Sequence, residues 1–428
     1  MSANDNDVPV PTPRDARRVL VLSTISFTLL FAVWLMFGVL GVPIKKELGL
    51  TQVQFSWLAA VAVLSGSLGR LPFGMLTDRV GGRALMAALL VTTAIPCALV
   101  SHAHSYGALI ALAFWLGGAG NSFSVGIAWN AAWSTPARQG FALGTFGAGN
   151  VGASVTKLIG PALIALVPTS GFLDGLVPGG WRFVPTLYAS TLLVCAVALL
   201  ALTPARDRKP GSARSFASML APLANARVWR FGLYYVLVFG AYVAFSLWMP
   251  TYYQTVYHLP LSRAALLTAA FIFPASLLRP VGGWLSDRLG ARVVTTSVFV
   301  TMMLACVPLC LPAVGAGGPI GLGACFTLLE IVGVAMGIGK ASVYKYVSAY
   351  FPGDVGAVGG LVGSLGALGG FFLPIGFAYL DRVTGRHESC FWLLLAFAGV
   401  SFAWLTAVVL RLKRGERPAA NGELARAA

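Results

Sequence analysis

The sequence predicts an all-α integral membrane protein with 12 transmembrane helices in two six-helix halves. Three observations predict it. The 428 residues are 57% hydrophobic and only 10% charged, with a mean hydropathy of +0.80, whereas soluble domains carry roughly 25% charged residues. Apolar runs of about 20 residues, the length that crosses a hydrocarbon core, recur along the whole chain. One charged motif occurs once in each half of the chain.

The apolar runs define the helices and the domain organisation. The first run is too long for the apolar region of a secretory signal, and further spans follow it, so we keep it as the first helix. We expect a tail at 1–19, a first half at 20–203, a linker at 204–230, a second half at 231–411 and a tail at 412–428. The predicted spans are 20–44, 53–76, 84–101, 106–130, 140–167, 185–203, 231–256, 264–285, 293–312, 319–349, 355–380 and 389–411.

The net charge of +16 follows the predicted topology. When the loops are assigned alternately to the two sides, most arginines and lysines fall on the side that holds both tails and the linker. The positive-inside rule places that side in the cytoplasm. We therefore expect a multi-pass protein of a bacterial inner membrane, in contact with the lipid bilayer, and the basic charge requires no nucleic-acid partner.

The repeated motif supports two parallel repeats. Residues 69–83 (GRLPFGMLTDRVGGR) recur at 278–292 (LRPVGGWLSDRLGAR), so that arginine, glycine, Asp-Arg, glycine and arginine return at the same spacing. A match between the second helix of each half is hard to obtain by chance.

Charged residues within the apolar spans point to an anion as the substrate. Five basic residues lie there, and each costs at least roughly 2.5 kcal/mol unless it faces a cavity or a partner. They are Arg70, Lys157, Arg279, Lys340 and Lys345, against one comparably deep carboxylate, Glu330. Arg70 precedes Asp78 and Arg279 precedes Asp287 by the same spacing, roughly 12 Å of helix. We expect the two guanidinium groups to hold one planar oxyanion from opposite halves, because they stay charged and offer paired donors. Snorkelling of each arginine to the surface is the alternative.

The fifth and eleventh spans are rich in glycine, at 144–161 and 356–374. Close helix packing through small residues accounts for part of this pattern. Glycines at this density also narrow the space between the halves, which suits a substrate of a few atoms.

The motif after the second helix resembles the loop motif of the major facilitator superfamily, G-x-L-x-D-R-x-G-x-R. The glycine-rich spans and one arginine in each of helices 2 and 8 resemble its nitrate/nitrite porter family. The resemblance implies an anion site and a cytoplasmic gate that latches the two halves. The implied anion-binding residues are Arg70, Arg279, Asn150, Tyr235, Phe239, Phe31, Gly147, Gly149, Gly360 and Gly363, and the implied gate residues are Asp78, Arg79, Arg83, Asp287, Arg288 and Arg292.

Lys157 and the helix 10 lysines resemble the proton-coupled nitrate importers of that family, whereas its exchangers have a neutral amide at the first position. The resemblance implies import of nitrate, or of nitrite, together with protons by alternating access. The proton-coupling candidates are Lys157, Lys340, Lys345 and Glu330. A nitrate/nitrite antiporter is the first alternative, and an organic-phosphate exchanger, whose family places its arginines on helices 1 and 7, is the second.

Other classes are disfavoured. The six cysteines lie in apolar runs without a CxxC spacing, and the four histidines lie in short polar breaks, so neither disulfides nor a metal site is expected. The spans contain no combination of nucleophile and base, so we expect neither an enzyme nor a bound cofactor. A non-transporting membrane receptor would need a large soluble or signalling domain, which we do not expect here. We expect a monomer.

Overall fold

The computed structural model describes residues 12–50, 52–172, 177–209, 215, 217, 220–313 and 318–424. Within these ranges the regular secondary structure is helical, apart from two isolated β-bridges, Phe172 with Val177 and Ala313 with Ile320. Ten of the described helices or helix runs are long and apolar enough to cross a membrane. The all-α prediction is confirmed.

The first half contains the elements α1 to α10, which correspond to the first six predicted spans. Most of these spans are pairs of helices joined by a tight break rather than single rods. They are α1 (Pro13–Trp34) with α2 (Phe37–Leu48); α3 (Gln52–Leu68) with α4 (Arg70–Val80); α5 (Gly82–Val100); α6 (Tyr106–Gly117), η2 (Gly118–Asn121) and α7 (Ser122–Trp133); η3 (Pro136–Arg138), α8 (Gln139–Gly147), η4 (Ala148–Val151) and α9 (Gly152–Leu166); and η5 (Gly180–Arg182) with α10 (Phe183–Leu202).

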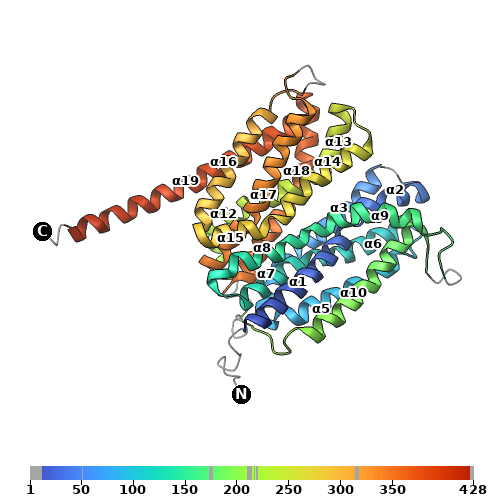
Figure 1. Ribbon diagram of the computed structural model, residues 1–428, viewed down its shortest axis with the longest axis horizontal. Coiled ribbons are helices and arrows are strands. Elements are labelled where there is room, and N and C mark those ends of the chain that lie inside the picture. The colour runs from blue at the N-terminus through green and yellow to red at the C-terminus, as the bar shows by residue number, and fades with distance from the viewer. Residues whose placement is uncertain are drawn as a thin grey trace.

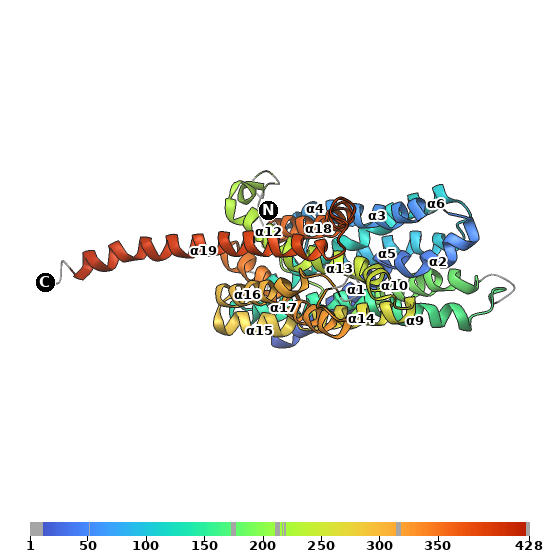
Figure 2. The ribbon, with the colours of Figure 1, turned by 90° about the horizontal axis from the view of Figure 1, so that it is seen from above.

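In the described part of the second half, only the seventh and eighth spans are broken, and the other four are single helices. Its elements are η6 (Ala221–Ala224); α12 (Ala226–Tyr235), the π-helical segment η7 (Val236–Gly240) and α13 (Ala241–Tyr257); α14 (Leu261–Leu277) with α15 (Arg279–Leu289); α16 (Ala291–Leu309); α17 (Leu322–Tyr350); α18 (Val355–Thr384); and α19 (Ser389–Leu424). Figures 1 and 2 show α19 extending well beyond the bundle.

Two helix ends differ most from the predicted spans. Helix α1 begins at Pro13 rather than at 20, because Thr12 caps it by accepting a hydrogen bond from the Asp15 backbone N–H and proline is favoured in a first helical turn. Helix α19 continues past residue 411 to Leu424, into the predicted tail. Hydropathy marks the membrane-crossing part of a helix and carries no information about its polar extension.

The two halves meet mainly through two helix pairs, α4 with α18 and α8 with α15. Figure 1 shows α8 and α15 side by side where the first half, blue to green, meets the second half, yellow to red. Helix α1 starts and α19 ends at one end of the bundle, and successive spans alternate in direction. The end of α4, the start of α8, the end of α15 and the start of α18 therefore all lie at this end, which we call the terminal end.

Glycines make the contact at the terminal end possible. A Cβ atom on Gly74 would lie 2.0 Å from the carbonyl oxygen of Gly356, and one on Gly283 would lie 2.0 Å from the carbonyl oxygen of Gly140. The α4–α18 and α8–α15 contacts are thus backbone against backbone. The two-fold internal repeat of the sequence appears here as two equivalent seams, so the halves are closed against each other at the terminal end.

Candidate functional site

Two arginines from opposite halves meet at the centre of the protein. Arg70 is the first residue of α4 and Arg279 the first residue of α15, and both side chains are fully buried. The guanidinium carbon of each lies 5.3 Å from the centroid of the Phe123 ring. Because they share this ring, the two guanidinium carbons lie within twice that distance of each other. The structure does not place either arginine at a surface, as snorkelling would require.

The two guanidinium groups are only partly hydrogen-bonded. Arg70 donates from Nε to the carbonyl oxygen of Gly66 at 3.3 Å and from Nη1 to that of Gly363 at 3.0 Å. Arg279 donates from Nη2 to the Tyr235 hydroxyl at 3.3 Å. Three buried nitrogens have no partner among the described residues: Arg70 Nη2, Arg279 Nε and Arg279 Nη1. Buried cationic donors without acceptors are costly, and a small anion would satisfy them.

Aromatic rings enclose these donors. Tyr235 directly precedes the π-helical segment in the seventh span and Phe239 lies within it, and their rings stack at 5.1 Å. Phe239 lies 5.5 Å from the Arg70 guanidinium carbon, and Trp34 lies 5.3 Å from it. Such rings exclude water, which strengthens every charge–charge interaction inside the enclosure.

Glycines of both repeats lie against the two arginines and leave room for them. A Cβ atom on Gly147 would lie 2.4 Å from Arg279 Cζ, and one on Gly363 would lie 2.9 Å from the Tyr344 hydroxyl and 3.5 Å from Arg70 Cδ. A Cβ atom on Gly360 would lie 2.6 Å from the carbonyl oxygen of Arg70, so that glycine brings α18 against α4. The glycine-rich spans therefore do more than pack helices, because Gly147 leaves room for a charged side chain.

The remaining predicted anion-binding residues are Asn150, Phe31 and Gly149, all in the first half. Asn150 in η4 is fully buried, and neither polar atom of its side chain has a partner among the described residues. Phe31 is buried against Phe27 and Trp34, with ring centroids 5.4 and 5.3 Å away, and no contact with an arginine is recorded for it. Gly149 brings η4 against α1, since its Cβ atom would lie 2.6 Å from Phe27 Cδ1.

The proton-coupling candidates separate into different environments. Lys340 is fully buried beside the site, where its Nζ donates to the carbonyl oxygen of Ala275 at 2.8 Å and lies 3.1 Å from the centroid of the Tyr242 ring and 5.8 Å from that of Phe239. Glu330 lies half-buried on α17, and its Oε1 has no hydrogen-bond partner among the described residues. The Lys157 side chain lies outside the described part of the protein.

Lys345, the remaining proton-coupling candidate, lies apart from the two arginines, and its role stays a prediction. Its Nζ lies 2.6 Å from the Asp287 carboxylate and donates to the carbonyl oxygen of Pro136 at 2.8 Å, at the terminal end. Lys345 follows Lys340 by five residues in the same predicted span. Only the packing of α17 against α8 and α15 brings its ammonium group to a carboxylate.

Two aspartates join the halves at the terminal end. Asp78 at the end of α4 accepts from the Gly356 backbone N–H at the start of α18, at 3.0 Å. Asp287 at the end of α15 accepts from the Gly140 and Phe141 N–H groups at the start of α8, at 3.0 and 2.8 Å. Each carboxylate thus meets the positive end of a helix dipole in the other half.

The arginines of the same motif lie within their own halves or at the surface. The Arg83 backbone N–H donates to Asp207 in the linker at 2.8 Å, and its Nε donates to Thr203 at the end of the first half at 3.2 Å. Arg288 is exposed and stacks over Trp284 at 4.4 Å. Arg292 is also exposed, and Arg79 lies half-buried on the last turn of α4.

Removing the aspartate charges should open the terminal end. We expect Asp78→Asn and Asp287→Asn each to weaken closure by about 1–2 kcal/mol, because an amide oxygen accepts more weakly than a carboxylate at a helix start. A membrane-impermeant maleimide should label Ser286→Cys, a buried position near the closed end, roughly tenfold faster in these backgrounds. Asp381→Asn, at the opposite end, should leave labelling unchanged. Equal labelling in all backgrounds would show that the aspartates do not hold the halves together.

Sequence reasoning missed Phe123 and Tyr344. Phe123 contacts both arginines, and the Tyr344 ring packs edge-on against Tyr235 at 4.9 Å and against Phe123 at 5.2 Å. A signal existed for Phe123: it follows Gly118-Ala119-Gly120-Asn121, which repeats the Gly147-Ala148-Gly149-Asn150 segment of the fifth span. Tyr344 lies between the two lysines that were singled out in the tenth span.

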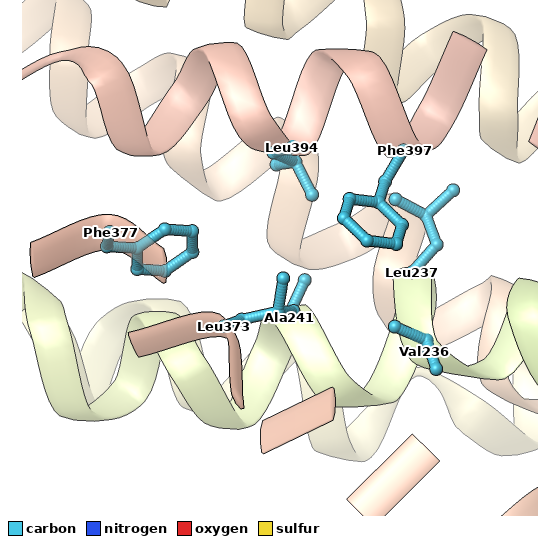
Figure 3. A pocket seen from close by; sticks show the side chains of 7 residues that line it. All are labelled: Val236, Leu237, Ala241, Leu373, Phe377, Leu394 and Phe397. Carbon is cyan, nitrogen blue, oxygen red and sulfur yellow. The ribbon is translucent and has the colours of Figure 1, made fainter. Parts of the chain in front are cut away.

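An apolar pocket lies apart from the arginines, between the seventh, eleventh and twelfth spans. Figure 3 shows the seven side chains that line it, all of them hydrophobic: Val236, Leu237, Ala241, Leu373, Phe377, Leu394 and Phe397. With no charged or polar side chain in its lining, it is not suited to an anion. Among the described residues, no group of three histidine, cysteine or acidic side chains could hold a metal ion.

The chain is similar to a known family, to individual proteins and to solved structures. The sequence profile described as Major Facilitator Superfamily matches residues 22–374. A Thermus thermophilus protein named "Probable nitrate/nitrite antiporter NarK1" is 58% identical over 94% of this chain and 94% of its own length. A Bacillus subtilis protein named "Nitrite extrusion protein" is 32% identical over 90% of this chain and 92% of its own. The crystal structure of the human organic anion transporter MFSD10 superposes with a TM-score of 0.72 at 18% identity, covering 92% of this chain and all of that one.

Proposed function

Because this chain belongs to the major facilitator superfamily and to its nitrate/nitrite porter family, we propose that it carries nitrate and nitrite across a bacterial cytoplasmic membrane by alternating access. Its family consists of transporters rather than enzymes. The observation that carries the proposal is the pair of buried arginines, one from each half, with three unpaired nitrogens around the shared Phe123 ring. A planar anion with three equivalent oxygens matches several donors in one enclosure.

The substrate class can be tested with purified protein in liposomes. When the vesicles are loaded with unlabelled nitrate or nitrite, labelled nitrate added to the external medium should accumulate inside them by counterflow. Loading with glycerol phosphate should give no counterflow, because the donors are too few and the enclosure too apolar for a dianion. Counterflow driven by the organic phosphate, and not by nitrite, would replace this substrate assignment with the exchanger alternative.

For the direction of transport we propose import coupled to protons. Nitrate alone would enter against a negative-inside potential, at about 2.3 kcal/mol per charge per 100 mV, and more than one proton per anion reverses that sign. Lys340 supports this proposal because it is fully buried beside the site with no carboxylate partner among the described residues. A lysine there is disfavoured in its charged form when the site is empty and favoured when an anion is bound, so binding of anion and proton reinforce each other.

Antiport of nitrate against nitrite is the second candidate. The names of the Thermus relative, an antiporter, and of the Bacillus relative, a nitrite extrusion protein, favour it. The binding of Lys345 to Asp287 also removes one lysine from the set that the coupling argument used.

The two modes predict different pH changes. We expect nitrate added to cells that express this protein to make the medium more alkaline, because protons enter with the anion. Lys340→Gln and Lys157→Gln should reduce proton-driven accumulation at least about tenfold while nitrate/nitrite counterflow falls less, since the neutral amide removes only the titratable group. Lys46→Gln, an exposed position, is the control. Rapid nitrate/nitrite exchange by the unaltered protein without any pH change would establish antiport instead.

The orientation and assembly complete the proposal. We place both termini in the cytoplasm because the basic residues of the loops gather on that side. The terminal end is then the cytoplasmic end, and its closure by Asp78 and Asp287 describes a protein closed to the cytoplasm. The anion site lies within one chain, formed by its two halves, so we propose a functional monomer.

A further inference from the structure

A third buried arginine lies outside the transport site. Arg230 lies one turn into α12, is only 8% exposed, and its Nε has no hydrogen-bond partner among the described residues. No carboxylate in the described ranges forms an ion pair with it. Its guanidinium carbon lies 5.3 Å from the centroid of the neighbouring Phe231 ring. A cation this deeply buried is costly to leave unpaired, so an anion should accompany it in the assembled membrane protein.

Two buried hydroxyl groups lie nearby, one on α12 itself and one on α17. The Tyr234 hydroxyl on α12 has no partner among the described residues, and the Tyr346 hydroxyl on α17 lies beside Thr295. The Tyr346 ring stacks on Phe231 at 5.1 Å, and both Arg230 and Arg292 are electrostatic neighbours of Tyr346. Arg227, one turn before Phe231, lies 5.3 Å over the Tyr350 ring. Three arginines and two hydroxyl donors therefore converge where α12, α16 and α17 begin or end.

The first half shows how an equivalent region is satisfied. There the Asp207 carboxylate accepts from the Nε1 atoms of Trp129 and Trp133, each at 2.9 Å, and from the Arg83 backbone N–H. Arg83 and Arg292 occupy the same place in the repeated motif. The first half thus supplies an anion from its own linker. In the described part of the second half, no side chain does the same for Arg230.

The position of these arginines and tyrosines in the membrane indicates which kind of anion would bind to them. It lies at the terminal end, where α12 enters the membrane, and Trp229 beside Arg230 is 50% exposed. Exposed tryptophan at a helix end is typical of the level of the lipid headgroups. We propose that Arg230, Tyr234 and Tyr346, with Arg227 and Arg292 at the rim, form a site for the phosphate of an anionic phospholipid. Basic pockets between transmembrane helices on this side suit such headgroups. This proposal does not rest on the transported substrate.

The site can be tested by lipid binding to the purified full-length chain in detergent. Native mass spectrometry should show phosphatidylglycerol adducts on the unaltered protein, and thermal unfolding should shift upward with phosphatidylglycerol but not with phosphatidylcholine. Arg230→Gln should weaken the apparent affinity for phosphatidylglycerol about tenfold, the effect of losing one charge-assisted contact. Arg230→Lys should retain part of it. Arg382→Gln, an exposed arginine at the opposite end, is the matched control.

Tyr234→Phe removes only a hydroxyl group and keeps the ring, so it tests the site even if Arg230→Gln unfolds. Like Arg230→Gln, it should weaken phosphatidylglycerol binding. Unchanged phosphatidylglycerol affinity in Tyr234→Phe and in every folded Arg230 variant would overturn the proposal. An equal upward shift with inorganic phosphate alone would also overturn it, because the bound anion would then be a free ion rather than a lipid.

Discussion

Arg70→Lys and Arg279→Lys should each lower the initial rate of nitrate counterflow at least about 100-fold. Each arginine already donates hydrogen bonds within the protein, Arg70 to Gly66 and Gly363 and Arg279 to Tyr235, and keeps other nitrogens unpaired. A lysine has the charge but one compact donor group, so it cannot hold these partners and an anion together. Losing two charge-assisted hydrogen bonds, at about 1.5–3 kcal/mol each, accounts for the expected loss.

The measurement is counterflow in liposomes at matched protein content, where no pH gradient or coupling step contributes. Arg382→Lys, at an exposed position in α18, should transport at the normal rate. Both buried variants should still insert and unfold cooperatively, because the charge remains. Normal counterflow in either variant would remove the paired arginines from the site, whatever the mode of coupling.

Gly147→Ala should reduce counterflow at least about tenfold, although the change adds a single methyl group. Its Cβ atom would lie 2.4 Å from Arg279 Cζ, where carbon atoms in contact are about 3.5 Å apart. The guanidinium group must move by about an ångström, whereas the side chains of a binding site must be held within roughly 0.5 Å of their positions. Gly147 faces a side chain rather than a backbone, so the displacement falls on the arginine and not on the fold.

The chain contains a matched control for this variant. Gly118 holds the same place in Gly118-Ala119-Gly120-Asn121 as Gly147 does in Gly147-Ala148-Gly149-Asn150, yet a Cβ atom on Gly118 would meet nothing within 4 Å. Gly118→Ala should therefore transport normally. Nitrate affinity should fall in Gly147→Ala while thermal stability stays close to normal. Equal activity of the two alanine variants would show that the Arg279 position does not depend on Gly147.

The spans, the two halves and the depth of the arginines follow from local patterns in the sequence. Apolar runs must match the thickness of a bilayer whatever their partners, and a duplicated motif places its residues at equivalent depths. This is why Arg70 and Arg279 could be paired before any contact was known. The breaks within the spans were not predicted, because hydropathy does not distinguish an α-helix from the 3-10 and π-helical segments η2, η4 and η7.

Which side chains face each other was decided by the tertiary structure alone. Lys340 and Lys345 are only five residues apart, yet Lys340 is buried beside the arginine site and Lys345 binds Asp287 at the terminal end. Phe123 contacts both arginines, although the Gly-Ala-Gly-Asn segment before it does not specify which side chains it meets. Periodicity and composition act along one helix, whereas the partner of a buried charge is set by how the two halves close on each other.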